Sequence, residues 1–201
     1  DWGLEVMQAY QDGDKSNGEA NFPFLGCNII EKSTGQLPKG VKEYQIIERG
    51  GLKIGIIGYI GYGIEEDIAV KMVENYQFTY PTTAVANVAK KLRTEENVDV
   101  VVVDAHSSAD EMLAECVGIT NISNKSNKRY VDAVFCAHSH QYEASEYNGV
   151  PFVQSGCNGR AYSEISLSVD KDGEVSLVTN NNHRSNTSEI RNITSYDSKI
   201  E

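Results

Sequence analysis

Two short apolar runs that lead into histidines constrain this chain more than any other feature. The run 131–136 is rich in β-branched and aromatic residues and is bounded by polar ones, which is typical of a buried strand. His138 and His140 follow it directly, and a second such run, 98–103, leads into His106. Open α/β sheets bind their ligands at the carboxyl ends of the strands. The pattern therefore predicts an α/β fold with a candidate site at that edge.

The residue types at this edge indicate a metal site. Three of the four histidines follow the two runs, and neutral imidazole binds zinc and similar first-row ions. His138 and His140 would reach the same side if the chain stays extended between them. We expect His106, His138 and His140 to converge on one cleft; the alternative is that they are ordinary polar residues of loops. His183 lies in the polar run 180–185, which we interpret as a solvated loop without a role.

Several segments, in order along the chain, resemble the motifs of one enzyme family. They are 21–29 (NFPFLGCNI), 51–58 (GLKIGIIG), 99–107 (DVVVVDAHS), 137–140 (AHSH) and 149–156 (GVPFVQSG). These segments are similar to the FPFLSANI, GxKIGIIG, DVVIxLSH, GH[ST]H and GTPVVQAG motifs of the 5′-nucleotidases and 2′,3′-cyclic-nucleotide phosphodiesterases. That family belongs to the calcineurin-like dinuclear metal enzymes, and the resemblance covers most of residues 1–179.

The resemblance implies a particular fold and domain organisation. The fold would be the later half of an α/β/β/α sandwich with mixed sheets, of the metallophosphatase type. Residues 1–179 would form a partial metallophosphatase domain. Residues 180–201, which are polar, would form a linker toward a C-terminal domain that is absent here.

The resemblance also implies roles for individual residues. His106 and His138 would ligate one divalent ion and His140 the other, with zinc or manganese as the expected metals. Asp104 would at most support these ligands without binding an ion itself. Ala137 stands where the family has glycine. The residues that bind substrate are not indicated.

The motifs that complete both metal sites in the family, DxH, GD and GNHE, are missing from this chain. Residues 1–5 (DWGLE) resemble the end of GNHEFDxGLE. Asp1 would then correspond to the aspartate that orients a catalytic histidine, and that histidine is absent. We therefore expect the chain alone to hold at most one weakly bound ion and to be a poor enzyme without the missing N-terminal half.

The resemblance implies a phosphohydrolase that acts on nucleotides or other phosphoesters; the alternative is a non-catalytic truncated module for surface interaction. The net charge of −11 opposes binding to a nucleic-acid polymer or an anionic membrane, because polyanions bind through Lys and Arg. No apolar run is long enough to span a membrane. The family resemblance implies an extracellular, cell-surface or periplasmic location.

Local patterns predict the other elements. We expect helices at 4–11 and 81–96, strands at 22–30, 43–47 and 53–60, and an antiparallel meander of 152–154, 164–169 and 174–178.

Overall fold

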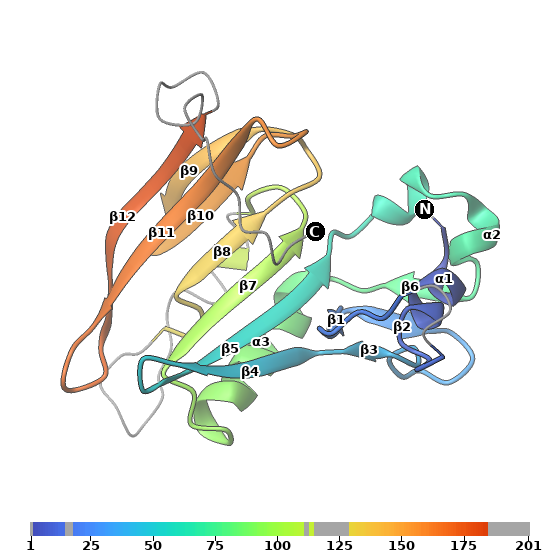
Figure 1. Cartoon of the computed structure of the whole chain (residues 1–201), viewed down its shortest axis with the longest axis horizontal. Coiled ribbons are helices and arrows are strands. Elements are labelled where there is room, and N and C mark those ends of the chain that lie inside the picture. Colours follow the sequence, from blue (N-terminus) through green and yellow to red (C-terminus); the bar gives the residue numbers. More distant parts are fainter. Residues whose placement is uncertain (1, 15–17, 111–112, 115–128, 185–201) are drawn as a thin grey trace.

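A six-stranded mixed sheet forms the centre of the computed structural model, which describes residues 2–14, 18–110, 113–114 and 129–184. Its strands are β4 (Tyr44–Arg49), β5 (Leu52–Ile60), β7 (Val100–His106), β8 (Ala133–Cys136), β9 (Tyr142–Tyr147) and β10 (Val150–Ser155). The order across the sheet is β4-β5-β7-β8-β10-β9 (Figure 1). The four inner strands are parallel, and the two outer strands are antiparallel to their neighbours. The expected α/β fold with mixed sheets is confirmed.

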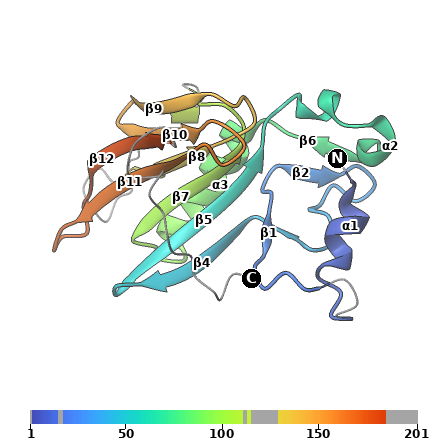
Figure 2. The ribbon, with the colours of Figure 1, turned by 45° about the horizontal axis from the view of Figure 1, so that its top comes forward.

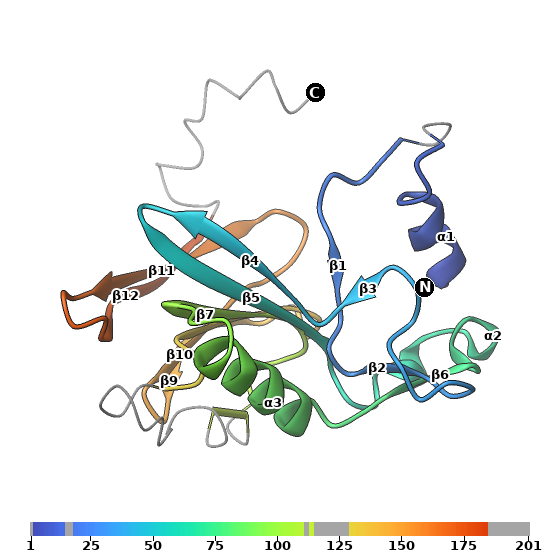
Figure 3. The same ribbon diagram turned by 90° about the horizontal axis from the view of Figure 1, so that it is seen from below.

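One long helix, α3 (Pro81–Thr94), covers one face of this sheet (Figure 3). It begins at Pro81, where the missing N–H costs nothing because the first turn has no acceptor for it. Its apolar stripe is fully buried and includes Val85, Ala89 and Leu92, which belong to the same cluster as the sheet residues Val101 and Val103. Burial of this stripe drives the docking of the helix, as its helical spacing predicts.

The hairpin of β11 (Ala161–Val169) and β12 (Val175–Arg184) lies over the β10 side of the opposite face (Figures 1 and 2). Asn180 donates its side-chain amide to the backbone carbonyl of Ser145 at 2.7 Å. Asn182 donates in the same way to the carbonyl of Glu143 at 2.7 Å. Amide side chains thus attach the hairpin to the edge strand of the main sheet.

Two expectations about this region are wrong. The segment 152–154 does not join a meander, because β10 pairs in parallel with β8 inside the main sheet. The linker expected from residue 180 does not begin there, because β12 continues through Arg184, and His183 is therefore a strand residue. The polar side chains at 180–184 do not show the apolar pattern of a strand, so local sequence did not predict one. The strand forms because β11 supplies its hydrogen-bond partners. Residues 185–201 lie outside the described residues.

Short elements make up the N-terminal side of the molecule. They are α1 (Leu4–Ala9), β1 (Phe24–Leu25), β2 (Ile29–Glu31), β3 (Val41–Lys42), η1 (Ile64–Asp67), α2 (Val70–Val73) and β6 (Tyr76–Phe78). β1 pairs with β3 and β2 pairs with β6, so the single strand expected at 22–30 is divided between two small sheets. No helix in the described part of the chain is both long and apolar enough to cross a membrane.

The break between β1 and β2 is organised by Asn28, which is fully buried. Its side-chain amide donates to the carbonyl oxygens of Ile60 at 2.7 Å and Thr79 at 2.8 Å, and its oxygen accepts from the N–H of Ile60 at 3.0 Å. A buried amide is stable only when its hydrogen bonds are made. Asn28 thereby fixes the end of β5, which pairs with the end of β7 at His106.

A close backbone approach joins β1 to β5. The N–H of Cys27 donates to the carbonyl of Gly58 at 2.7 Å. A Cβ atom at position 58 would lie 2.4 Å from the Cβ of Leu25, so only glycine fits. This contact sets the wall of the region next to Asp104, because Gly58 and Asp104 are register partners.

Candidate metal centre

The four parallel strands bring their carboxyl ends to one edge of the sheet, as the sequence predicts. His106 is the last residue of β7. The neighbouring strand β8 ends at Cys136, and the chain then enters a turn that carries His138 and His140. A hydrogen bond from the N–H of Ala137 to the carbonyl of Ser107, at 3.0 Å, ties this turn to the end of β7. The two histidine-bearing segments are therefore side by side.

His106 and His138 face each other at this edge. Their ring centroids are 5.2 Å apart with an interplanar angle of 63°, an edge-to-face arrangement. Partial burial and the neighbouring His138 lower the pKa of His106 below its ordinary value, while the Asp104 carboxylate acts in the opposite direction. The neutral imidazole is thereby favoured, and that is the form that binds a metal ion.

Asp104 lies two residues before His106 on the same face of β7. Burial raises the pKa of the Asp104 carboxyl above its ordinary value, and the charge of His106 opposes this shift. The carboxylate thus lies close enough to the imidazole to influence its protonation. This proximity suits the supporting role that the family resemblance implies for Asp104.

His140 is placed differently from the other two. It is exposed, and its backbone φ is 57°, while that of His138 is 70°. Both residues are in the left-handed region, which non-glycine residues rarely adopt. The chain is therefore not extended from His138 to His140, and the argument that alternation puts both rings on one side does not apply. Among the described residues, the three histidines do not form a group whose donor atoms all lie within 4.8 Å of one another.

Asp67, which the sequence patterns did not single out, contacts this edge. Its Oδ2 atom lies 3.6 Å from Nε2 of His138, and the aspartate side chain is 68% exposed. The acidic run of η1, Glu65-Glu66-Asp67, was the available signal in the sequence. Only the fold shows which carboxylate of the run approaches the histidine. Asp1 lies outside the described residues.

A cavity of about 370 Å³ opens beside His106. Its lining includes Asp104, His106 and Ala137 at the sheet edge, together with Phe24 and Tyr59. This is within the size range of pockets that hold small molecules. A cavity next to paired imidazoles is an arrangement that can hold a phosphoester next to a bound cation.

The other polar clusters lie elsewhere. His183 stacks on Tyr162 with ring centroids 4.5 Å apart, and its Nε2 lies 3.2 Å from Oε2 of Glu164. Within the described residues, the one group of three carboxylate, imidazole or thiolate donors within 4.8 Å is Asp12, Asp14 and Glu19, all exposed.

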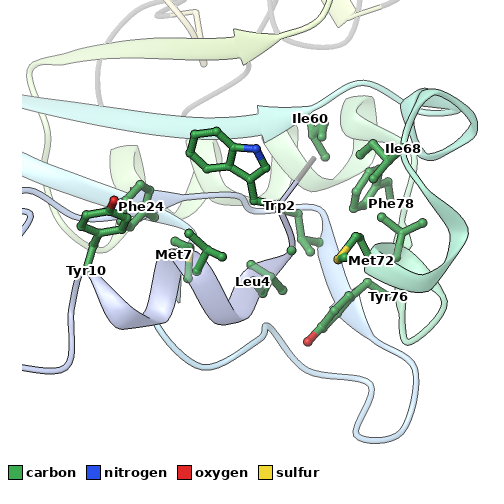
Figure 4. A pocket seen from close by; sticks show the side chains of 14 residues that line it. Trp2, Leu4, Met7, Tyr10, Phe24, Ile60, Ile68, Met72, Tyr76 and Phe78 are labelled. Carbon is green, nitrogen blue, oxygen red and sulfur yellow. The ribbon is translucent and has the colours of Figure 1, made fainter. Parts of the chain in front are cut away.

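A larger pocket of about 560 Å³ lies between α1, β2, β6 and α2 (Figure 4). Trp2, Met7 and Phe78 are among the apolar and aromatic side chains that line it. The described lining residues include no histidine, aspartate or glutamate. This pocket therefore adds no metal ligand to the sheet edge that carries His106 and His138.

Three curated proteins are similar to this chain in sequence. Endonuclease YhcR of Bacillus subtilis (strain 168) is 30% identical over 175 residues, which are 83% of this chain and 14% of that protein. Cell wall protein Lmo0130 of Listeria monocytogenes is 24% identical over 165 residues, 76% of this chain and 21% of that protein. The 2′,3′-cyclic-nucleotide 2′-phosphodiesterase/3′-nucleotidase of Salmonella typhimurium is 26% identical over 176 residues, 81% of this chain and 27% of that protein. The chain thus spans only a small part of each relative.

Solved structures share the fold. The calcineurin-like phosphoesterase YfkN of Bacillus subtilis has a TM-score of 0.64 at 19% identity, with 90% of this chain and 62% of that chain covered. A 5′-nucleotidase precursor from Thermus thermophilus has a TM-score of 0.61 at 16% identity, with 82% of this chain and 33% of that chain covered. No model of a protein family matches the chain. The chain is thus similar in sequence to a 2′,3′-cyclic-nucleotide 2′-phosphodiesterase/3′-nucleotidase, and it shares its fold with a calcineurin-like phosphoesterase and a 5′-nucleotidase precursor.

Proposed function

We propose that this chain supplies part of the metal centre of a phosphoesterase that hydrolyses nucleotides. The observation that carries the proposal is the pair His106 and His138, whose rings meet at the carboxyl edge of the sheet beside a cavity. The lowered pKa of His106 favours the neutral ring that a metal ion needs. The relationship to nucleotidases and phosphodiesterases supports the same class of reaction.

In this proposal each residue has a defined role. His106 and His138 would hold one divalent ion, zinc or manganese, and His140 would contribute to a second. Bound divalent ions supply charge neutralisation at the phosphate and a more acidic bound water. Asp104 would orient His106 and keep its ring in place, and Asp67 is near enough to His138 to orient that ring. Asp1 would orient the catalytic histidine of the missing GNHE motif.

The complete centre would need the DxH, GD and GNHE motifs in addition to this chain. We therefore propose that full activity belongs to a longer protein and that this chain alone turns over substrate slowly, with at most one weakly held ion. The relative that is a cell wall protein supports a location outside the cytoplasm. We place the natural substrates among small nucleotides, because the net charge of −11 disfavours a polyanionic polymer.

Calorimetric titration with zinc or manganese tests the metal site. We expect weak binding by the wild type, loss of binding in His106→Ala and in His138→Ala, and unchanged binding in His183→Ala, the matched control on β12. Protons compete for imidazole, so binding should weaken as the pH falls below the ordinary histidine pKa of ~6.5 toward the lowered pKa of His106. Equal affinity in all four proteins would remove the site from the proposal.

Hydrolysis assays test the reaction. Substrates should include a nucleoside monophosphate, a 2′,3′-cyclic nucleotide and a polynucleotide, since one relative is named an endonuclease. We expect slow hydrolysis by the chain alone, even with added manganese or zinc, because half of the ligands and the acid histidine are absent. Rapid metal-dependent turnover by the chain alone would show that the correspondence of its residues with the family motifs is wrong.

A further inference from the structure

Gln154 is a polar residue in the most deeply buried strand of the sheet. It lies in β10 directly after Phe152 and Val153, which are 0% and 1% exposed, and it is itself only 2% exposed. A buried amide costs free energy unless its donors and acceptor are all paired. The hydrogen-bond partners of the Gln154 side chain therefore indicate its structural role.

All hydrogen-bond partners of the Gln154 side-chain amide lie in the segment 137–141. We name this segment the histidine turn because it contains His138 and His140. An amide orientation is assigned from its hydrogen-bond partners, and one orientation of Gln154 satisfies every neighbour. Its oxygen then accepts from the N–H of His140 at 2.9 Å and from the N–H of Gln141 at 2.8 Å. Its nitrogen donates to the carbonyl of Ala137 at 3.2 Å and to Oγ of Ser139 at 3.1 Å.

The turn needs such support because its backbone is unfavourable. His138 and His140 have φ of 70° and 57°. An L-residue in this region brings its Cβ close to the backbone, so the conformation persists only when surrounding contacts impose it. Gln154 contacts the backbone on both sides of His138 and at His140 itself. The bonds made by Gln154 therefore hold the segment in which both strained residues lie.

We infer that Gln154 is the positioning residue of the histidine turn: its buried amide holds the backbone that directs His138 toward His106 and presents His140 at the sheet edge. As a statement about metal ligands, the inference rests on the proposed function. As a statement about the turn, it rests on the hydrogen bonds alone. The two parts can be tested separately.

Amide hydrogen exchange and ring-to-ring NOE measurements on the 201-residue chain test the positioning role. In the wild type, the His140 and Gln141 amides should exchange slowly, and protons of His106 and His138 should show an NOE. In Gln154→Leu, these two amides should exchange faster, on the order of tenfold or more, because their acceptor is lost, and the NOE should weaken. Gln154→Glu keeps an acceptor for both amides but loses the donor to Ala137, so it should retain part of their protection.

Val150→Ala is the matched control, because Val150 is a fully buried residue of the same strand with no contact to the turn among the bonds described. Val150→Ala should raise the amide exchange rates throughout β8 and β10, with no larger effect on the His140 and Gln141 amides than on the others. Unprotected His140 and Gln141 amides in the wild type would overturn the inference, and so would equal effects of Gln154→Leu and Val150→Ala. If Gln154→Leu does not fold, the inference is decided by the wild type and Gln154→Glu: unprotected His140 and Gln141 amides in either protein would overturn it.

Zinc titration of the same proteins tests the link to the metal centre. Gln154→Leu should bind zinc more weakly, on the order of tenfold, while Val150→Ala binds as the wild type does. If the wild type binds no zinc, the proposed function fails, and the amide exchange still decides the role of Gln154. If zinc binds equally to Gln154→Leu and wild type, the link between Gln154 and the ligands is overturned.

Discussion

At the scale of single residues, the protonation of His106 at the carboxyl edge of the sheet is subject to two opposite influences. Burial and His138 disfavour the charged form of His106, and Asp104 favours it. Burial and His138 have the larger effect, so the pKa of His106 lies below its ordinary value in the folded chain. In the unfolded chain both influences vanish. Folding therefore favours loss of a proton from His106.

This balance predicts two opposite shifts in the metal-free chain. Asp104→Asn should lower the pKa of His106 further, because it removes the one favourable charge, whereas His138→Ala should raise it, because it removes a repulsive neighbour. NMR titration of the ring C–H signals of His106 measures both. Identical midpoints in the two variants would contradict the electrostatic account.

The same shift sets the sign of a pH effect on stability. The pKa of His106 is lower in the folded chain than in the unfolded chain. Above the ordinary pKa of ~6.5 the ring is neutral in both states, so His106 does not reduce the stability there. Stability is lost as the pH falls from there toward the folded pKa, since the unfolded chain binds the proton more tightly. Metal binding and folding should therefore both weaken in mild acid.

At the scale of elements, helix α3 is attached to the sheet by a buried ion pair as well as by its apolar stripe. The Arg93 guanidinium contacts Asp132 Oδ2 at 2.5 Å, with the side chains 2% and 5% exposed. Arg93 also donates to the carbonyls of Val98 and Asp99, and the Asp132 carboxylate accepts from the N–H of Val101. The pair thus joins the end of the helix to the starts of β7 and β8.

Removing one partner of this pair should be costly. Arg93→Met should destabilise the fold by about 3–5 kcal/mol, because it leaves the Asp132 carboxylate buried without its cation. Lys91→Met is the matched control on the same helix: its pair with Glu43 at 3.4 Å is 40% and 38% exposed, and exposed pairs contribute about 0–1 kcal/mol. Urea unfolding of both variants measures the difference. Similar losses in the two would show that Arg93 and Asp132 contribute no more than a surface pair.

At the scale of the whole molecule, the hairpin β11–β12 is held to the main sheet by polar contacts in addition to packing. Asn180 reaches Ser145 and lies near the carbonyl of Phe152 at 3.5 Å, and Asn182 reaches Glu143. These bonds satisfy carbonyls of the edge strand β9 and of β10. The hairpin therefore protects the end of a sheet whose edge would otherwise be open.

Loss of the Asn180 contact should loosen the hairpin and leave the central sheet intact. In Asn180→Ala, the amides of β11 and β12 should exchange several-fold faster, since one hydrogen bond contributes about 1 kcal/mol. Asn181→Ala, an exposed position on the same strand, should have little effect. Hydrogen exchange followed by mass spectrometry reports both segments at once. Equal exchange in the two variants would mean that packing alone holds the hairpin.

The sequence by itself determined the parts of the molecule that depend on local pattern. Apolar runs and helical spacing predicted the strands that became β5, β7 and β8 and the helix α3, because burial of each pattern requires that periodicity. The placement of His106 and the 138–140 pair at the carboxyl edge followed from the same runs. The metal roles of these residues remain a prediction.

Only the tertiary structure decided features that depend on partners far away in the chain. Asn28 divides one apolar run into two strands because Ile60, at the end of β5, and Thr79, directly after β6, supply its hydrogen-bond partners. β10 is parallel to β8, and β12 extends through residues 180–184, because each strand has a partner that its own pattern does not reveal. The left-handed backbone at His138 and His140, supported by Gln154, is likewise absent from local pattern. Periodicity records which residues are buried, whereas strand pairing and backbone strain are set by contacts between segments distant in sequence.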